Sequence, residues 1–268
     1  GADGRIRTLG RGGSDTSAVA IAAALNADRC DIYTDVDGVY TTDPRIAPKA
    51  RKLSHITFEE MLEMASSGAK VLQTRSVAMA MRYNVNLQVL SSFNNTVGTL
   101  VVSEDSVLEQ ETISGIAYSP DEAKVTIVGL PDRPGVAAVV FGALANGYVN
   151  VDMIVQSAST ATKKTDISFS VSRADLDRAI EIINGTKSEL GFDSVDSSPN
   201  VAKISVVGTA MRTQPGVAKT MFETLASKGV NLHVISTSEI KISVLIDAEY
   251  TELAVRSLHA AFGLDDDG

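Results

Sequence analysis

The sequence predicts an α/β protein in two parts, a mostly parallel sheet covered by helices and then two copies of a small βαββαβ unit. Three observations predict this architecture. Strand-like and helix-like segments alternate at short spacing through the first hundred residues. A polar, acidic stretch, SEDSVLEQETISG, occupies residues 103–115. Beyond it, one arrangement of residues occurs twice, which indicates an internal repeat.

The composition argues against two classes of partner, nucleic acids and membranes. The net charge of −9 and the absence of tryptophan argue against a nucleic-acid partner, because phosphates bind basic surfaces and bases stack on aromatic rings. The longest apolar run, Ala18 to Leu25, is shorter than the roughly 20 residues that cross a bilayer. We therefore expect a cytoplasmic protein with neither a nucleic-acid nor a membrane partner.

Cysteine and histidine are too few and too scattered to predict a metal site. The single cysteine, Cys30, excludes an intramolecular disulfide and a cysteine-based zinc site, and we expect it to be a small buried side chain at a strand start. His55, His233 and His259 share no ligand spacing, so we interpret them as ordinary surface or partly buried histidines.

The first part begins with the end of a strand, RIRTL at residues 5–9, and a glycine loop. A helix is expected over residues 15–27, capped by Ser14 or Asp15, and because it is apolar on all sides we expect it to be buried. CDIYT (30–34) is typical of a strand, and residues 35–48 are typical of a long loop.

Two helices and a strand complete this part. TFEEMLEMASSGA (57–69) predicts a helix with a capping box, because Thr57 is followed three residues later by Glu60. A further helix is expected from Thr74 to Tyr83, and NLQVLSS (86–92) predicts another strand.

The glycine loop allows two interpretations. Gly12 and Gly13 let the backbone approach a ligand, the helix presents free N–H groups, and Arg11 adds a planar cation, which together form a cradle for an anion. The Gly-Lys-Ser/Thr ending of a P-loop is absent. A simple tight turn between strand and helix explains the local pattern equally well.

A second loop, YTDVDGVYTTDPR (33–45), places Asp35, Asp37 and Asp43 directly after a strand. Open α/β sheets bind ligands in loops at the carboxyl ends of their strands. Asp-Val-Asp-Gly also resembles the start of a calcium loop, but the other ligand positions and the terminal glutamate do not follow. We therefore favour a ligand-binding loop of another kind.

The repeat is clearest when residues 123–159 are placed over residues 202–239. Ala-Lys aligns at an offset of 79, and Pro-Gly-Val-Ala (134–137 and 215–218) aligns at 81. Each copy continues with a further strand (166–171; 240–246) and a second helix (173–190; 249–262). This order predicts a four-stranded antiparallel sheet with two helices on one face, a ferredoxin-like unit.

Four stretches together, GRGGSDTSA, YTDVDGVYTTDPR, FEEMLEMASSGAKVL and VISTSEI, resemble the aspartate kinase family. Its members join an amino-acid kinase domain to a C-terminal pair of ACT domains, and the resemblance extends from about Arg5 to Leu264. It implies transfer of the ATP γ-phosphoryl group to the β-carboxylate of L-aspartate, giving 4-phospho-L-aspartate. That reaction is the entry step to lysine, threonine and methionine synthesis.

The resemblance also implies which residues bind substrate and nucleotide. The aspartate-binding motif is matched by Arg11, Gly12, Gly13, Ser14 and Asp15. The nucleotide-binding positions are matched by Thr34, Asp35, Tyr40, Arg45, Lys70 and Val71, and Mg²⁺ is implied together with ATP. For Lys70, a surface lysine at a helix end remains the alternative.

The catalytic lysine of the family lies in a Lys-Phe/Tyr-Gly-Gly loop, and this sequence contains no such motif. We therefore expect residues 1–103 to be the C-terminal part of a kinase domain that has no catalytic residue and is inactive alone. Residues 104–122 are expected to form a linker and a strand of the second ACT domain. Residues 123–200 and 201–264 are expected to form the first and second ACT domains.

For the ACT pair, the resemblance implies a homodimer or higher oligomer and an effector site for lysine, threonine or both. The implied effector-binding residues are Asp132, Pro134, Gly135, Val136, Ala137, Gln156, Asn231 and Leu232. The second loop carries Thr213-Gln214 in place of Asp132-Arg133, so its occupancy stays open. Pro-Gly as mere helix-start chemistry, a non-catalytic regulatory subunit built on the ACT pair, and a kinase for another acid are the alternatives.

Overall fold

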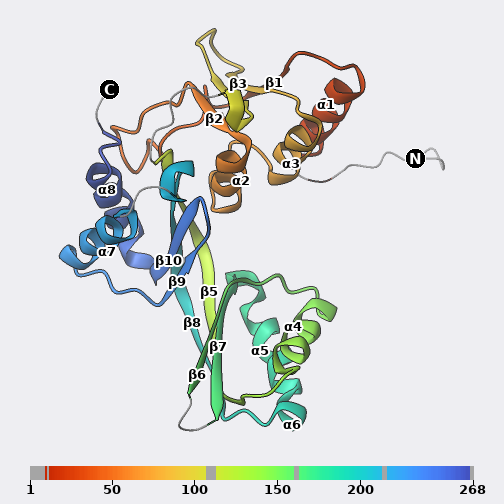
Figure 1. The fold of residues 1–268 in the computed structure, drawn as a ribbon, viewed down its shortest axis with the longest axis vertical. Coiled ribbons are helices and arrows are strands. Elements are labelled where there is room, and N and C mark those ends of the chain that lie inside the picture. The colour runs from red at the N-terminus through yellow and green to blue at the C-terminus, as the bar shows by residue number, and fades with distance from the viewer. Residues whose placement is uncertain (1–9, 11, 107–112, 160–162, 213–215, 266–268) are drawn as a thin grey trace, which may run out of the picture.

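The computed structural model describes residues 10, 12–106, 113–159, 163–212 and 216–265. These residues form two sheets, a four-stranded sheet near the N-terminus and a six-stranded sheet that runs through the rest of the chain (Figure 1). In this part of the chain no helix is both long and apolar enough to cross a membrane. The expected strand at residues 5–9 lies outside the described residues.

The first sheet is mostly parallel, as predicted, and contains one antiparallel pair. Its strand order is β1-β3-β4-β2, with β1 parallel to β3, β2 parallel to β4, and β3 antiparallel to β4. The strands are β1 (Cys30–Thr34), β2 (His55–Thr57), β3 (Leu87–Ser91) and β4 (Thr99–Val102). Cys30 is buried at the start of β1, as predicted. Three helices accompany the sheet: α1 (Gly13–Ala24), α2 (Phe58–Ser66) and α3 (Thr74–Tyr83).

Helix α1 differs from its prediction in its start, its cap and its burial. Gly12 is the N-cap with φ 68°, and no side chain caps the helix; the Ser14 hydroxyl donates to Asp15 instead. A Cβ at Gly12 would collide with the side chain of Gln73, so glycine is required there on two grounds. Only Val19 and Ala22 are buried, whereas Ile21 and Leu25 are 60% and 73% exposed. An apolar helix is buried only where another element covers it, and the described residues leave this face open.

Helix α2 confirms the predicted capping box. The Thr57 hydroxyl accepts a hydrogen bond from the Glu60 backbone N–H, and the Glu60 carboxylate accepts one from the Thr57 backbone N–H at 3.1 Å. Helix α3 begins and ends at Thr74 and Tyr83, the predicted residues.

Two long strands, β5 (Gly115–Pro131) and β8 (Ser194–Val207), join the two repeats into one sheet of order β6-β7-β5-β8-β10-β9. The other strands are β6 (Asp152–Ser159), β7 (Lys164–Ser172), β9 (Val234–Thr237) and β10 (Lys241–Asp247). Residues 115–119 pair with residues 203–207, and residues 124–128 pair with residues 194–198, on either side of a register shift. Each repeat therefore uses one half of both long strands, and the two predicted four-stranded sheets are continuous.

Each half of this sheet has its own helices and core, and we call the halves the first and second regulatory units. The first unit comprises residues 122–201, with α4 (Val136–Asn146), α5 (Leu176–Gly185) and α6 (Lys187–Leu190). The second comprises residues 113–119 and 201–265, with α7 (Val217–Ser227) and α8 (Thr251–Ala261). Short 3₁₀ turns lie at Glu104–Ser106, Arg173–Asp175, Thr209–Arg212 and Ala248–Tyr250. Figure 1 shows the first unit apart from the N-terminal sheet and the second beside it.

The buried carboxylate of Glu60 attaches the second unit to α2. One oxygen serves the capping box, and the other accepts hydrogen bonds from the Ser114 hydroxyl and from the Thr209 backbone N–H at 3.1 Å. On the same helix, Glu63 forms an ion pair of 2.6 Å with Lys241 of β10. Helix α2 is therefore held by polar contacts on the second unit as well as by its own cap.

A second attachment joins α8 to the loop after β1. The fully buried imidazole of His259 contacts the Thr41 hydroxyl through Nε2 at 2.8 Å and Asp265 through Nδ1. The Thr41 carbonyl also accepts a hydrogen bond of 2.7 Å from the backbone N–H of Ile116 in β5. His259 is thus not the ordinary surface or partly buried histidine that the sequence suggested, because it is sealed between two parts of the molecule.

Candidate nucleotide site

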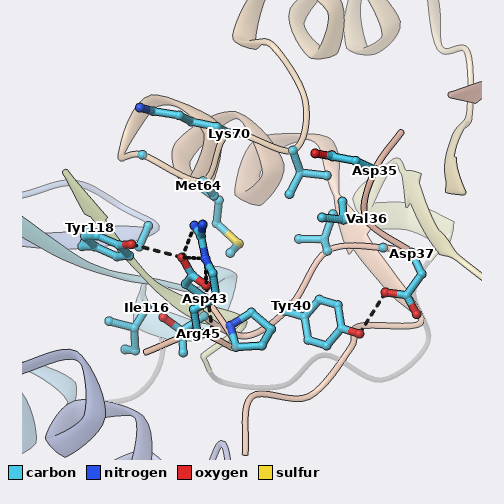
Figure 2. Close-up of a pocket in the computed structure, with 18 of the residues that line it drawn as sticks. Asp35, Val36, Asp37, Tyr40, Asp43, Arg45, Met64, Lys70, Ile116 and Tyr118 are labelled. Atoms are coloured by element: carbon cyan, nitrogen blue, oxygen red, sulfur yellow. Dashed lines mark hydrogen bonds and ion pairs between the residues drawn. The ribbon is translucent and has the colours of Figure 1, made fainter. Parts of the chain in front are cut away.

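A cavity of about 670 Å³ lies where the N-terminal sheet meets the second unit (Figure 2). One wall is the loop after β1, a second is the turn after α2 together with the loop after β3, and a third is strand β5. Loops at the carboxyl ends of parallel β1 and β3 thus face the cavity, as expected for an open α/β sheet.

The structure brings five of the six predicted nucleotide-binding residues to this cavity. They are Asp35, Tyr40, Arg45, Lys70 and Val71, from two separated stretches of the chain. Thr34 is not among the lining residues, but its hydroxyl donates to the Asp35 carboxylate at 3.1 Å. Gly68 precedes Lys70 with φ 118°, and a Cβ there would collide with the Tyr118 carbonyl, so glycine lets this turn approach β5 closely.

Arg45 is held by a charged fork at the cavity wall. Its Nη2 lies 2.7 Å from Asp43 Oδ2, its Nε lies 3.0 Å from Oδ1, and its backbone N–H also donates to Oδ1 at 2.9 Å. The Tyr118 hydroxyl donates to the same carboxylate at 3.1 Å (Figure 2). The Arg45 hydrogen bonds hold the pKa of Asp43 below its usual range, so this carboxylate stays charged. Burial and the neighbouring Asp43 charge raise the pKa of Tyr118, which keeps its hydroxyl a donor.

A second pair occupies the opposite end of the loop. The Tyr40 hydroxyl donates to Asp37 at 2.9 Å, and Lys52 forms an ion pair of 3.1 Å with the other Asp37 oxygen. Burial opposes ionisation of Asp37, but the bonds from Lys52 and Tyr40 outweigh it and lower its pKa. Asp37 is therefore neutralised by its own loop.

Two charged side chains of the cavity, Lys70 and Asp35, form no ion pair with the residues that the structure describes. Lys70 is exposed. The exposed carboxylate of Asp35 accepts a hydrogen bond from the Thr34 hydroxyl. Among the described residues the arrangement therefore leaves Lys70 as a cation for an anionic ligand and Asp35 as a carboxylate for a cation, with Arg45 held beside them by Asp43.

The predicted substrate-binding residues lie outside the cavity lining. Gly12, Gly13, Ser14 and Asp15 form the N-terminal end of α1, where Gly13 donates its backbone N–H to the Gly10 carbonyl at 3.0 Å. Arg11, the predicted carboxylate ligand, lies outside the described residues.

Within one chain, the predicted effector residues before α4 lie far from Asn231 and Leu232. Asp132, Pro134 and Gly135 form the turn between β5 and α4, in which Gly135 has φ 94°. Val136 and Ala137 begin α4, and of these five residues Val136 alone is buried. Gln156 is exposed on the edge strand β6. Asn231 and Leu232 precede β9, whose Val234 is level with Ser119 across the sheet, roughly 30–40 Å along β5 from Pro131. Thr213 and Gln214 lie outside the described residues.

Tyr118 and Phe93 are among the cavity residues that the sequence did not predict. Tyr118 is 75 residues from Asp43, and no local pattern connects them. Phe93, at the cavity edge after β3, is 80% exposed, which is unusual for an aromatic side chain. Asp43, the partner of Tyr118, did give a signal in the sequence, because the acidic loop that contains it follows a strand.

Comparison with known proteins agrees with this architecture. Residues 1–91 match the amino acid kinase family, and residues 125–186 and 204–262 match the ACT domain. An aspartokinase of Pseudomonas aeruginosa is 56% identical over 98% of this chain. The chain spans 64% of the length of that relative.

Solved structures give the same result. E. coli aspartokinase III in complex with aspartate and ADP is 30% identical, with a TM-score of 0.80 over 97% of this chain and 57% of that one. The same enzyme with lysine and aspartate is 31% identical, with a TM-score of 0.75 over 96% and 57%. The regulatory subunit of aspartate kinase from Thermus thermophilus is 38% identical, with a TM-score of 0.53 over 56% of this chain and 99% of that subunit. Kinase segment, paired ACT units and cavity together assign the chain to the aspartate kinase family.

Proposed function

We propose that this chain carries the nucleotide-binding and regulatory portions of an aspartate kinase. The reaction is transfer of the γ-phosphoryl group of ATP to the β-carboxylate of L-aspartate, giving 4-phospho-L-aspartate. We also propose the division of the chain into a kinase portion (1–103), a connecting segment and strand (104–122), and two ACT domains (123–200 and 201–264).

The observation that carries the proposal is the convergence on one cavity of Asp35, Tyr40, Arg45, Lys70 and Val71. Phosphoryl transfer depends on positioning and on neutralising the charge of the phosphates. Lys70 supplies a cation that forms no ion pair with the described residues, and Arg45, although paired with Asp43, adds a second guanidinium-type donor at the same wall. A regulatory subunit limited to the ACT pair would lack this cavity.

Within this function the remaining residues have distinct roles. The free N–H groups at the start of α1 would hold a carboxylate of aspartate, and Asp15 would accept from its ammonium group. Asp35 fits a magnesium ligand, because its exposed carboxylate faces the cavity, and Mg²⁺ is typically held by one or two carboxylates plus phosphates. When bound, Mg²⁺ would neutralise charge on the phosphates.

Titration calorimetry of the 268-residue chain with ADP and Mg²⁺ tests the nucleotide site. We expect binding, weakened about tenfold by Arg45→Ala or Lys70→Ala, since each removes a charge-assisted contact. Arg82 is an exposed arginine of α3 whose guanidinium lies over the Tyr83 ring, so Arg82→Ala is the matched control and should bind ADP as the unaltered chain does.

We expect this chain to form no 4-phosphoaspartate, because its sequence has no Lys-Phe/Tyr-Gly-Gly motif. Absence of ADP binding would refute the assignment of the cavity.

We propose further that lysine or threonine binds the turn before α4, with its carboxylate on the backbone N–H groups near Gly135 and its ammonium group on Asp132. A second copy would supply Asn231 and Leu232, since one chain keeps them far from this turn. The exposed Ile154 and Ile235 on edge strands β6 and β9 suit pairing between two copies of the chain.

Calorimetry with lysine and with threonine tests whether either binds, and sedimentation with and without each amino acid tests whether two copies associate. Asp132→Ala should abolish binding and Asp196→Ala should not, and binding that survives Asp132→Ala would contradict the proposal.

A further inference from the structure

We infer that Tyr118, a residue of the regulatory sheet, positions Arg45 in the nucleotide cavity through the carboxylate of Asp43. This inference rests on the proposed function of the cavity. It makes the second regulatory unit part of the wall that orients a phosphate-binding cation.

Arg45 depends on Asp43 for its orientation. Its side chain is 88% exposed, so packing does not hold it, whereas the side chain of Asp43 is only 16% exposed. Two guanidinium contacts, at 2.7 Å and 3.0 Å, form the fork between them. A long exposed arginine otherwise samples many rotamers, and the fork selects one of them.

Besides the backbone N–H and the guanidinium of Arg45, Asp43 has a third hydrogen-bond donor, and this donor comes from a different part of the fold. The Tyr118 hydroxyl reaches Oδ2, the oxygen that also binds Arg45 Nη2 (Figure 2). Without this donor, the carboxylate would be attached only to its own loop, two residues from Arg45, and could swing with it. The Tyr118 hydroxyl therefore fixes the position of the loop after β1 relative to strand β5.

Tyr118 is itself fixed by the sheet. It pairs with Ile204 of β8, and its ring packs against the core of the second unit. Gly68 lies against the Tyr118 carbonyl, so strand β5 also runs close to the turn that carries Lys70. The position of the hydroxyl is therefore determined by the regulatory sheet rather than by the loop that it contacts.

The same strand leads to the turn proposed to bind the effector. Strand β5 extends from Gly115 through Tyr118 to Pro131, directly before Asp132, and its pairing with β8 shifts register between Ser119 and Lys124. A displacement of β5 along its length would move the Tyr118 hydroxyl relative to Asp43 and change the orientation of Arg45. A physical connection between effector and nucleotide thus needs only one strand and one hydrogen bond.

The test compares Tyr118→Phe with Tyr250→Phe in the full 268-residue chain. Both tyrosines are partly buried against the same core, so each variant removes one hydroxyl from a ring that packs there, and of the two only Tyr118 lines the cavity. The first readout is the ¹⁵N relaxation of the Arg45 Nε–Hε group, assigned by its loss in Arg45→Lys. The second is the ADP dissociation constant in the presence of Mg²⁺.

We expect Tyr118→Phe to lower the order of the Arg45 Nε–Hε group and to weaken ADP binding about three- to tenfold, the range for the loss of one ordinary hydrogen bond. Tyr250→Phe should change neither. Unchanged Arg45 order in Tyr118→Phe would overturn the inference, and so would lower order with unchanged ADP affinity. If the unaltered chain binds no ADP, the proposed function fails, while the relaxation data still decide whether Tyr118 orders Arg45.

Discussion

The two regulatory units share one topology, yet among the residues that the structure describes only the second forms the polar contacts with the N-terminal part that are given above. The hydrogen bonds and ion pairs described above between these parts come from Ser114, Tyr118, Thr209, Lys241 and His259, all of the second unit. The first unit extends away from the N-terminal sheet and leaves the turn before α4 exposed (Figure 1). The repeat has thus produced one unit that docks and one that is open to a ligand.

Single positions account for much of this difference. When β7 is aligned with β10 on their shared Ile-Ser, Lys241 takes the place of Asp166. Lys241 reaches Glu63 of α2, whereas Asp166 accepts the backbone N–H of Gly129 within its own unit. When α5 is aligned with α8 on buried Ala179 and Ala254, the buried His259 takes the place of the exposed Asn184. The repeat keeps its apolar face and changes its outer face, which is the face that decides docking.

Removing Glu60 should have the largest effect on this difference. Glu60→Ala leaves the Ser114 hydroxyl and the Thr209 and Thr57 N–H groups without their carboxylate, so we expect a loss of about 3 kcal/mol in unfolding free energy. Urea denaturation followed by circular dichroism measures it. Glu181→Ala, an exposed glutamate of α5, is the control and should cost less than about 0.5 kcal/mol. Equal costs for the two variants would mean that the second unit is not held through α2.

Exchanging the paired residues of α5 and α8 should have a smaller effect. His259→Asn removes the contacts to Thr41 and Asp265 from a fully buried site, and we expect it to cost about 2 kcal/mol. Asn184→His introduces the same ring at an exposed site and should change stability by less than about 0.5 kcal/mol. Scanning calorimetry of both variants checks the pair of values. A similar loss in both would show that the histidine acts through helix propensity rather than through docking.

The smallest effect concerns Glu122, where the two units meet. Its carboxylate lies 3.8 Å from Lys203, but burial outweighs this cation and raises the pKa of Glu122. A raised pKa means that the folded chain holds the proton to higher pH than the unfolded chain, so this group contributes stability at low pH and loses it as pH rises through the raised pKa. Neutral glutamine does not incur this loss.

We therefore expect the thermal midpoint of Glu122→Gln, relative to that of the unaltered chain, to rise between about pH 4 and pH 8. Differential scanning fluorimetry across that range measures the sign. Glu181→Gln provides the control, because an exposed carboxylate should leave the difference constant. A constant or falling difference for Glu122→Gln would contradict the burial argument.

The sequence predicted local elements better than it predicted their burial. Thr57 and Glu60 defined the start of α2, and the predicted limits of α3 were correct. The start of α1 was wrong, because the left-handed Gly12, rather than a side chain, begins that helix. Its predicted burial was wrong as well, since apolar character indicates what a face can pack against and not whether something covers it.

By itself, the sequence determined the helices, most of the strands, the repeat and the family, because periodicity, caps and long motifs are local properties of the chain. Only the tertiary structure decided that β5 and β8 are shared between the units, that His259 is buried, and that Tyr118 faces Asp43. The two hydrogen bonds in this set join residues 218 and 75 positions apart, and no local pattern encodes such a pair. They form only when a folded sheet carries one partner to the other, so geometry and not composition selects them.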